Sequence, residues 1–134
     1  MAKMKRRIKV TDDQWFGCGY YQTVYRISQR RIVKIAKVKF KPEHQKEILK
    51  SEIEGSKTLM FALPVLEVVD VELPTGEVVE GTLRRYIPNE INDYEFDELD
   101  NKYNFDGTDN HRDNFRLDSR GNIWRTDTQL NFPC

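Results

Sequence analysis

A long pair of β-type segments between residues 65 and 87 is the feature that most constrains the fold of this chain. Residues 65–73 read Val-Leu-Glu-Val-Val-Asp-Val-Glu-Leu, which is rich in the β-branched residues that strands favour. Residues 74–77 read Pro-Thr-Gly-Glu, which is typical of a β-turn, and residues 78–87 return with a second strand pattern. The sequence therefore predicts a long β-hairpin here.

Shorter strand patterns precede this hairpin. Residues 5–10, 23–27 and 31–37 each predict a strand, and together they predict a three-stranded meander. Residues 42–60 begin with proline and carry a rough apolar stripe, which predicts a helix. The N-terminal part is thus expected to be a five-stranded antiparallel sheet with one packed helix inserted after the third strand, an α+β fold.

The remaining residues have a different character. Residues 89–106 are polar and acidic, which predicts a linker with at most a short helix. Residues 115–126 predict two short strands joined by a polar turn that contains Gly and Asn. We therefore expect a sheet-and-helix unit over residues 1–88, an acidic linker over 89–106 and a hairpin unit over 107–134.

The formal charge is zero, but it is unevenly distributed. Residues 1–57 hold 15 Lys and Arg against 6 Asp and Glu, a net charge of +9, and residues 58–134 hold 7 against 16, a net charge of −9. A basic half and an acidic half can attract each other within one molecule or between two copies, so a homodimer is one expectation. The basic half would also suit an anion such as a nucleotide phosphate.

Cysteine content and hydropathy predict a cytoplasmic protein. Cys18 and Cys134 have neither metal-site spacing nor a disulfide framework, so free thiols are expected. The basic start has no apolar run behind it, unlike a signal peptide, and no stretch approaches the ~20 apolar residues of a membrane span. We expect no membrane partner.

Three polar residues in the last quarter of the chain have the chemistry of phosphoryl transfer. Asp109 can orient a hydroxyl group, and Asn114 and Asp127 can hold a metal ion. The hairpin predicted between Asn114 and Asp127 would fold these two residues back beside each other. Taken singly, each of the three is an ordinary turn residue, and His111 in the same polar segment suggests a structural or solvent-exposed role.

A second group of candidates lies in the basic half. Gly17 and Gly19 fall between two strands, where glycine lets backbone amides approach phosphates without a Cβ in the way. A simple turn is the competing interpretation. Lys34 stands in an otherwise apolar strand and needs a partner or a ligand there, unless it faces solvent. Lys37 or Lys39 could take its place in another register.

The predicted helix offers a partner for this lysine. Glu52 lies in the middle of the helix and could pair with Lys34, holding it for a phosphate. Glu47 and Glu54 are competitors, and a solvated helix face is the alternative role for any of the three.

The order of these features resembles the protein-kinase-like fold, including its aminoglycoside-phosphotransferase-like relatives. The family's Gly-x-Gly-x-x-Gly-x-Val is similar to the segment from Gly17 to Val24, with Gln22 in place of the third glycine. The resemblance runs from about Trp15 to Asp127. The family's strand lysine, its helix glutamate, the two ends of its Asp-x-x-x-x-Asn loop and its metal-binding Asp would be Lys34, Glu52, Asp109, Asn114 and Asp127.

The resemblance implies ATP and Mg²⁺ as cofactors. Gly17, Gly19, Val24 and Lys34 would bind the nucleotide, with Lys34 on its α- and β-phosphates. By the same resemblance, the glutamate on the helix would pair with that lysine. Mg²⁺ would be held by Asn114 and Asp127, and the acceptor hydroxyl would be oriented by Asp109. The expected architecture is a kinase N-lobe-like sheet followed by a catalytic-loop hairpin, without a full helical C-lobe.

The chain also departs from the family pattern. Gly107 stands where the family has His, and Thr128-Gln129 follow Asp127 in place of Phe-Gly. Neither the apolar helix that normally supports the catalytic loop nor the large helical lobe has a counterpart. The resemblance therefore implies a natural minimal form, such as a phage or mobile element carries, or a degenerate one.

Three functions follow as hypotheses. The first is a minimal phosphotransferase that moves the γ-phosphoryl group of ATP to a hydroxyl acceptor, on a protein or a small molecule. The second is a non-catalytic, pseudokinase-like module that binds a protein partner as an inhibitor or adaptor, through exposed aromatic residues. The third and weakest is nucleic-acid binding by the basic arm, for which no accompanying motif exists. The second hypothesis uses Tyr94, Phe96, Tyr103, Phe105 and Trp124, and the third uses Lys3, Lys5, Arg6, Arg7 and Lys9.

Overall fold

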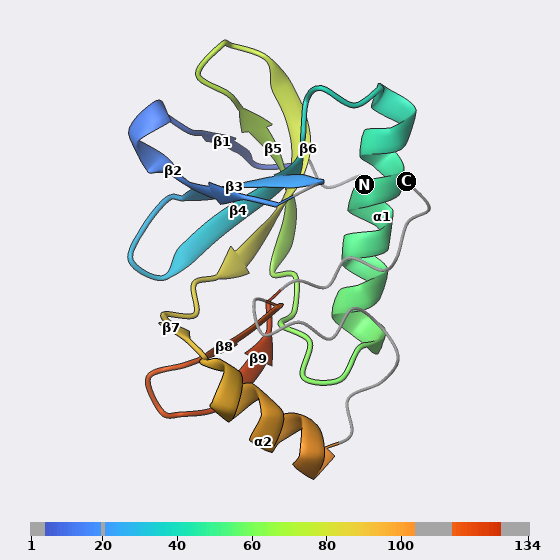
Figure 1. Cartoon of the computed structure of the whole chain (residues 1–134). Helices are drawn as coiled ribbons and strands as arrows, with labels where there is room; N and C mark the ends of the chain where they lie inside the picture. Colours follow the sequence, from blue (N-terminus) through green and yellow to red (C-terminus); the bar gives the residue numbers. More distant parts are fainter. Residues whose placement is uncertain (1–4, 20, 104–113, 127–134) are drawn as a thin grey trace. The chain divides into compact units, whose positions relative to one another are not determined.

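The computed structural model describes residues 5–19, 21–103 and 114–126 (Figure 1). These residues form a six-stranded mixed sheet, a three-stranded sheet and two α-helices, which confirms the predicted α+β class. They divide into two compact units, one from residues 1–50 and 65–86 and the other from residues 51–64 and 87–134. Asp109, His111 and Asp127 lie outside the described residues.

The first unit is built on the six-stranded sheet, whose strand order is β1-β5-β6-β4-β3-β2 (Figure 1). The predicted hairpin is confirmed: β5 and β6 pair antiparallel from Glu67–Leu83 to Glu72–Val78. Gly76 closes its turn with a φ of 89°, a conformation that glycine adopts without strain. The strands are β1 (Arg7–Lys9), β2 (Trp15–Cys18), β3 (Gln22–Arg26), β4 (Arg31–Ala36), β5 (Glu67–Glu72) and β6 (Val78–Arg85).

The prediction of five antiparallel strands is wrong in two respects. A sixth strand, β2, pairs with β3 and follows a short 3₁₀ helix, η1 (Asp12–Gln14). The first strand, β1, does not join the meander but pairs parallel with β5, placing Ile8 beside Val71. This pairing is favourable because Ile8 packs against the apolar core and Val10, just after β1, is fully buried in it.

The apolar core of this unit lies on one face of the sheet. Residues directly opposite each other on antiparallel strands point to the same face, so Val33, Leu83 and their row neighbours share it. Gly81 lies on the same face, and a Cβ there would lie 2.7 Å from the carbonyl oxygen of Lys34, so close packing requires glycine. The buried members of this core are Val10, Val33, Ile35, Val69, Val71, Leu73 and Leu83.

Helix α1 (Pro42–Thr58) follows β4 and confirms the predicted helix to within two residues at its C-terminal end. Its first turns belong to the first unit, where the imidazole of His44 packs against the rings of Phe40 and Tyr21 at centroid distances of 4.6 and 6.3 Å. Ile48, one turn further on, is fully buried. The first turn of α1 therefore makes an aromatic contact with Tyr21, the residue that precedes β3.

The second unit replaces the predicted linker with ordered elements. Residues 89–106 contain β7 (Asn89–Glu90) and an eleven-residue helix, α2 (Asp93–Tyr103). A capping box starts this helix: Glu95 N–H donates to Asn92 Oδ1 at 2.7 Å, and Asn92 N–H donates to Glu95 Oε1 at 3.1 Å. Phe96 packs against Phe115, with ring centroids 5.7 Å apart, in a small core that includes Ile91.

The predicted C-terminal hairpin is confirmed. Strands β8 (Phe115–Leu117) and β9 (Ile123–Arg125) pair antiparallel, and β7 adds to β8 to complete the three-stranded sheet. The segment after α1 joins the same unit, because Arg125 exchanges backbone hydrogen bonds with Phe61 and Leu63 at 2.7 and 2.9 Å. The hairpin is thus held from both sides by main-chain contacts.

Candidate functional site

The strongest site candidate is a row of residues that crosses the six-stranded sheet. Gly17 on β2 pairs with Val24 on β3, and Val24 pairs with Lys34 on β4. Lys34 in turn pairs with Thr82 on β6. Four of the residues that a nucleotide site would use or border therefore lie side by side, on the face of the sheet opposite the apolar core.

The packing of the described residues does not require glycine at either of these two positions. Neither Gly17 nor Gly19 has a φ in the left-handed region, and a Cβ on either would meet no described atom within 4 Å. Glycine in a strand costs about 0.5–1 kcal/mol relative to alanine. Because no described residue packs against these two positions, the glycines leave open space above the β2–β3 hairpin, where a methyl group would otherwise stand.

Lys34 does not face solvent. Its exposed fraction is 7%, so the interpretation as a solvent-facing strand lysine is wrong. The competing residues Lys37 and Lys39 follow the last residue of β4 instead of lying within it. Lys34 is therefore the lysine that the sheet buries in the site row.

Two site residues could not be found by motif. Thr82 is fully buried opposite Lys34, and its hydroxyl oxygen has no hydrogen-bond partner among the described residues. Arg84 is also fully buried and pairs with Ile32, one row along the same face. Together with Lys34 they give this face two cationic side chains and a hydroxyl group, which is the chemistry that binds phosphate.

Glu52 lies in the second unit, in the part of α1 that begins at Ser51. It is fully buried, whereas the competitors Glu47 and Glu54 are exposed. The solvated role therefore applies to Glu47 and Glu54 and not to Glu52. Its predicted ion pair with Lys34 stays a prediction.

Asn114 immediately precedes β8, and the hairpin brings it opposite Thr126. The carbonyl oxygen of Asn114 accepts a hydrogen bond from the Thr126 N–H at 2.8 Å and from the Thr126 hydroxyl at 3.4 Å. Asn114 is buried, with an exposed fraction of 8%. The hairpin thus places Asn114 beside Thr126, the residue that precedes Asp127 in the sequence. The proposed roles of Asp109 and Asp127 fall outside the described residues.

A carboxylate fixes the turn that makes this arrangement possible. Asp118 accepts hydrogen bonds from the Arg120 and Asn122 N–H groups, both at 2.9 Å, and from the indole N–H of Trp124 at 3.0 Å. The Trp124 hydrogen bond and then the Asn122 backbone bond lower the pKa of Asp118 from 3.8 to about 2. Gly121 lies in this turn, and its φ of 82° is in the left-handed region that glycine adopts without strain.

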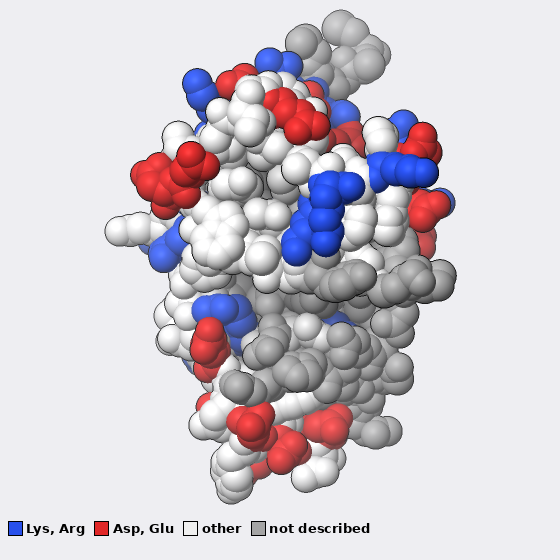
Figure 2. All heavy atoms as spheres, turned by 45° about the horizontal axis from the view of Figure 1, so that its top comes forward, with Lys and Arg blue, Asp and Glu red and all other residues white. Residues whose placement is uncertain are grey.

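Basic residues of the N-terminal arm form ion pairs with carboxylates of the sheet. Arg6 pairs with Glu67 at 3.1 Å, Lys9 pairs with Glu72 at 3.7 Å, and Lys5 pairs with Glu80. Figure 2 shows basic and acidic side chains interspersed on the visible surface. These pairs reduce the basic charge that a nucleic acid would need.

Not all of the predicted contact aromatics are exposed. Tyr94 has an exposed fraction of 71% and Tyr103 one of 37%, but Phe96 is buried and belongs to the core of the second unit. Trp124 is half-buried and donates to Asp118, and Phe105 lies outside the described residues. The role of Phe96 as a contact residue is therefore wrong.

Two comparisons with known proteins found no match. No protein-family model matches the chain, and no curated protein sequence is significantly similar to it.

Within residues 5–19, 21–103 and 114–126, no cluster of three His, Cys, Asp or Glu side chains could hold a metal ion. The described helices include none that is long and apolar enough to cross a membrane.

Proposed function

We propose that this chain is a minimal kinase-like, nucleotide-binding phosphotransferase. The observation that carries the proposal is the row Gly17, Val24, Lys34 and Thr82, which aligns an open glycine hairpin with a buried lysine and a buried hydroxyl. ATP is the ligand proposed for this row, because glycines without a Cβ admit phosphate oxygens and a lysine neutralises them.

Each residue of the row has a distinct part in binding. The open space at Gly17 and Gly19 lets backbone amides of the β2–β3 hairpin approach the phosphates. Val24 offers an apolar surface to the base. Lys34 supplies the cation for the α- and β-phosphates, positioned by Glu52. Mg²⁺, held by Asn114 and Asp127, would screen the charge of the transferred group, and Asp109 would orient the hydroxyl acceptor.

Label transfer from γ-labelled ATP tests the proposal. The full chain is incubated with labelled ATP and Mg²⁺, and labelling of the chain itself and of hydroxyl-bearing test acceptors is followed over time. We expect labelling that Asp127→Asn and Asp109→Asn abolish, whereas Asp97→Asn, a change on the exposed side of α2, leaves it unchanged. Equal labelling of the wild type and the Asp127→Asn variant would contradict the transferase assignment.

A non-catalytic, pseudokinase-like binding module is the second candidate. The exposed aromatic side chains of Trp15, Phe16 and Tyr94, with exposed fractions of 54, 42 and 71%, favour it, because such side chains commonly anchor protein contacts. It predicts that Lys34→Ala and Asp127→Asn leave partner binding intact. It also predicts that ATP and Mg²⁺ leave the melting temperature unchanged, and a clear increase that Lys34→Ala abolishes would contradict this candidate.

A further inference from the structure

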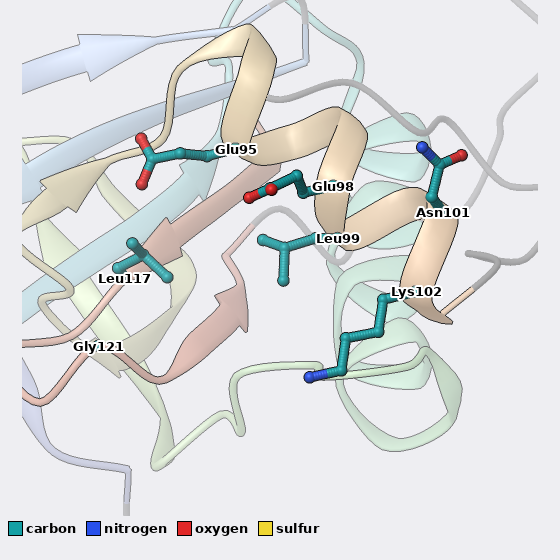
Figure 3. Close-up of a pocket in the computed structure, with 7 residues that line it drawn as sticks. All are labelled: Glu95, Glu98, Leu99, Asn101, Lys102, Leu117 and Gly121. Carbon is teal, nitrogen blue, oxygen red and sulfur yellow. The ribbon is translucent and has the colours of Figure 1, made fainter.

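A hollow lies in the second unit between α2 and the β8–β9 hairpin (Figure 3). It is roughly 680 Å³ in volume. Leu99 on α2 and Leu117 on β8 give it apolar surface, and the side chains of Glu95 and Glu98 extend from α2 on the same side. Glu98 is exposed and forms no ion pair with any described cation. Lys102 on α2 also lines the hollow, and its ammonium group lies 5.1 Å from the centre of the Tyr103 ring. The hollow therefore combines apolar surface with two carboxylates and one ammonium group, a net charge of −1.

The first unit carries a feature of opposite charge. The β3–β4 turn reads Arg26-Ile27-Ser28-Gln29-Arg30-Arg31, and none of its three arginines forms an ion pair with a described carboxylate. This contrasts with the basic residues of β1 and its flanks, which do find carboxylates.

The turn is also held in shape. The guanidinium of Arg26 donates to the carbonyls of Ser28 and Gln29 at 3.2 and 3.1 Å, and it stacks over the Tyr86 ring at 3.9 Å. The Arg30 N–H donates to Ser28 Oγ at 3.3 Å, while the Arg30 carbonyl accepts from the Tyr86 N–H at 2.9 Å. Arg26 thus braces the backbone, and the exposed Arg30 side chain is left at the tip.

We propose that the β3–β4 turn of one copy of this chain docks into the α2 hollow of a second copy. The Arg30 guanidinium would bind the carboxylates of Glu98 and Glu95, and its methylene stem would pack on Leu99 and Leu117. Charge complementarity selects this occupant, because the same chain carries both a pre-shaped arginine turn and an acidic hollow with an apolar floor. This self-association is independent of nucleotide binding.

Each copy offers one turn and one hollow, which fixes the kinds of assembly that can form. If both contacts form between the same two copies, the result is a closed two-fold dimer; if they cannot, the contact repeats along an open chain. Both assemblies are salt-sensitive, because the contact is made by exposed charges.

Sedimentation velocity of the full chain over a concentration series, at low and high salt, tests the proposal. We expect association at low salt that high salt weakens. Arg30→Glu and Glu98→Arg should each weaken it by at least about tenfold, since each change replaces an attraction by a repulsion. Both side chains are exposed, so the variants are expected to fold normally, and unchanged melting temperatures would establish this. Lys46→Glu, an exposed charge reversal on α1, is the matched control and should leave association unchanged.

A charge swap separates a specific contact from a general charge effect. An equal mixture of the Arg30→Glu and Glu98→Arg variants should associate again, because each turn then meets a hollow of opposite charge. The double variant in one chain should also self-associate. A chain that stays monomeric at every concentration, association that neither variant weakens, or a mixture that fails to associate would each overturn the proposal.

Discussion

The β2–β3 hairpin gives the sharpest single prediction, because the described residues leave room for a methyl group at Gly17. Gly17→Ala places a methyl group where no described atom lies within 4 Å, at a backbone conformation that alanine adopts. The variant should therefore keep or gain stability, by about 0.4–1 kcal/mol, since alanine restricts the unfolded chain. If a phosphate occupies this space, the same methyl group excludes it, and ATP affinity should fall by at least about tenfold, or 1.4 kcal/mol.

Gly81→Ala is the matched comparison. A Cβ there would lie 2.7 Å from the Lys34 carbonyl oxygen and 2.9 Å from Ile35 Cγ2, so backbone or side chains must shift. We expect a loss of about 1–3 kcal/mol, typical of overpacking. The pair separates the two reasons for which a strand contains glycine: close packing at Gly81 and room for a ligand at Gly17.

Urea denaturation and ATP titration by calorimetry measure both quantities on the same samples. The expected result is a Gly17→Ala variant that is as stable as the wild type but binds ATP more weakly. A destabilised Gly17→Ala variant would show that the fold itself needs this glycine. Unchanged ATP affinity in a stable variant would refute the assignment of the hairpin to phosphate binding.

Three further predictions concern single side chains. Asp118→Ala should destabilise the β8–β9 hairpin. In the wild type, the contribution of ionised Asp118 to the free energy of unfolding is complete above pH 3.8 and is lost as the pH falls through about 2. The urea midpoints of the two proteins should therefore converge in acid. Phe115→Ala should cost about 3–5 kcal/mol in urea denaturation, because this ring is buried against Phe96 and under the Arg125 guanidinium; a loss below 1 kcal/mol would contradict the packing. Thr82→Val should leave stability the same or higher, because it removes a hydroxyl with no described partner, and calorimetry should show weaker ATP binding if that hydroxyl contacts the ligand.

Local patterns predicted the elements whose partners are close in sequence. The β5–β6 and β8–β9 hairpins and helix α1 were all predictable, because alternation, turn residues and a proline start act over a few residues. The parallel pairing of β1 with β5 joins residues more than sixty positions apart, and no local signal encodes it. For the segment that contains α2, the sequence predicted a linker with at most a short helix, because its charge suggested a linker, although Asn92 and Glu95 have the spacing of a capping box.

The candidate site also contains residues that a motif could select and residues that only the tertiary structure identifies. Gly17, Val24 and Lys34 could be selected by motif, and the strand register places them in one row. Thr82 belongs to that row through the β4–β6 pairing, which no motif records. Burial also separates Glu52 from Glu47 and Glu54, a distinction that depends on tertiary packing and not on helix position.

Melting temperature against ATP concentration, with and without Mg²⁺, tests the central proposal most directly. A ligand at one hundred times its dissociation constant stabilises the folded state by about 2.7 kcal/mol, which should raise the melting temperature by several degrees. We expect ATP to raise the melting temperature of the wild type and Mg²⁺ to raise it further. Asp127→Asn should lose only the Mg²⁺ increment, and Gly17→Ala should reduce both. A melting temperature that no concentration of ATP changes, with or without Mg²⁺, would contradict the account.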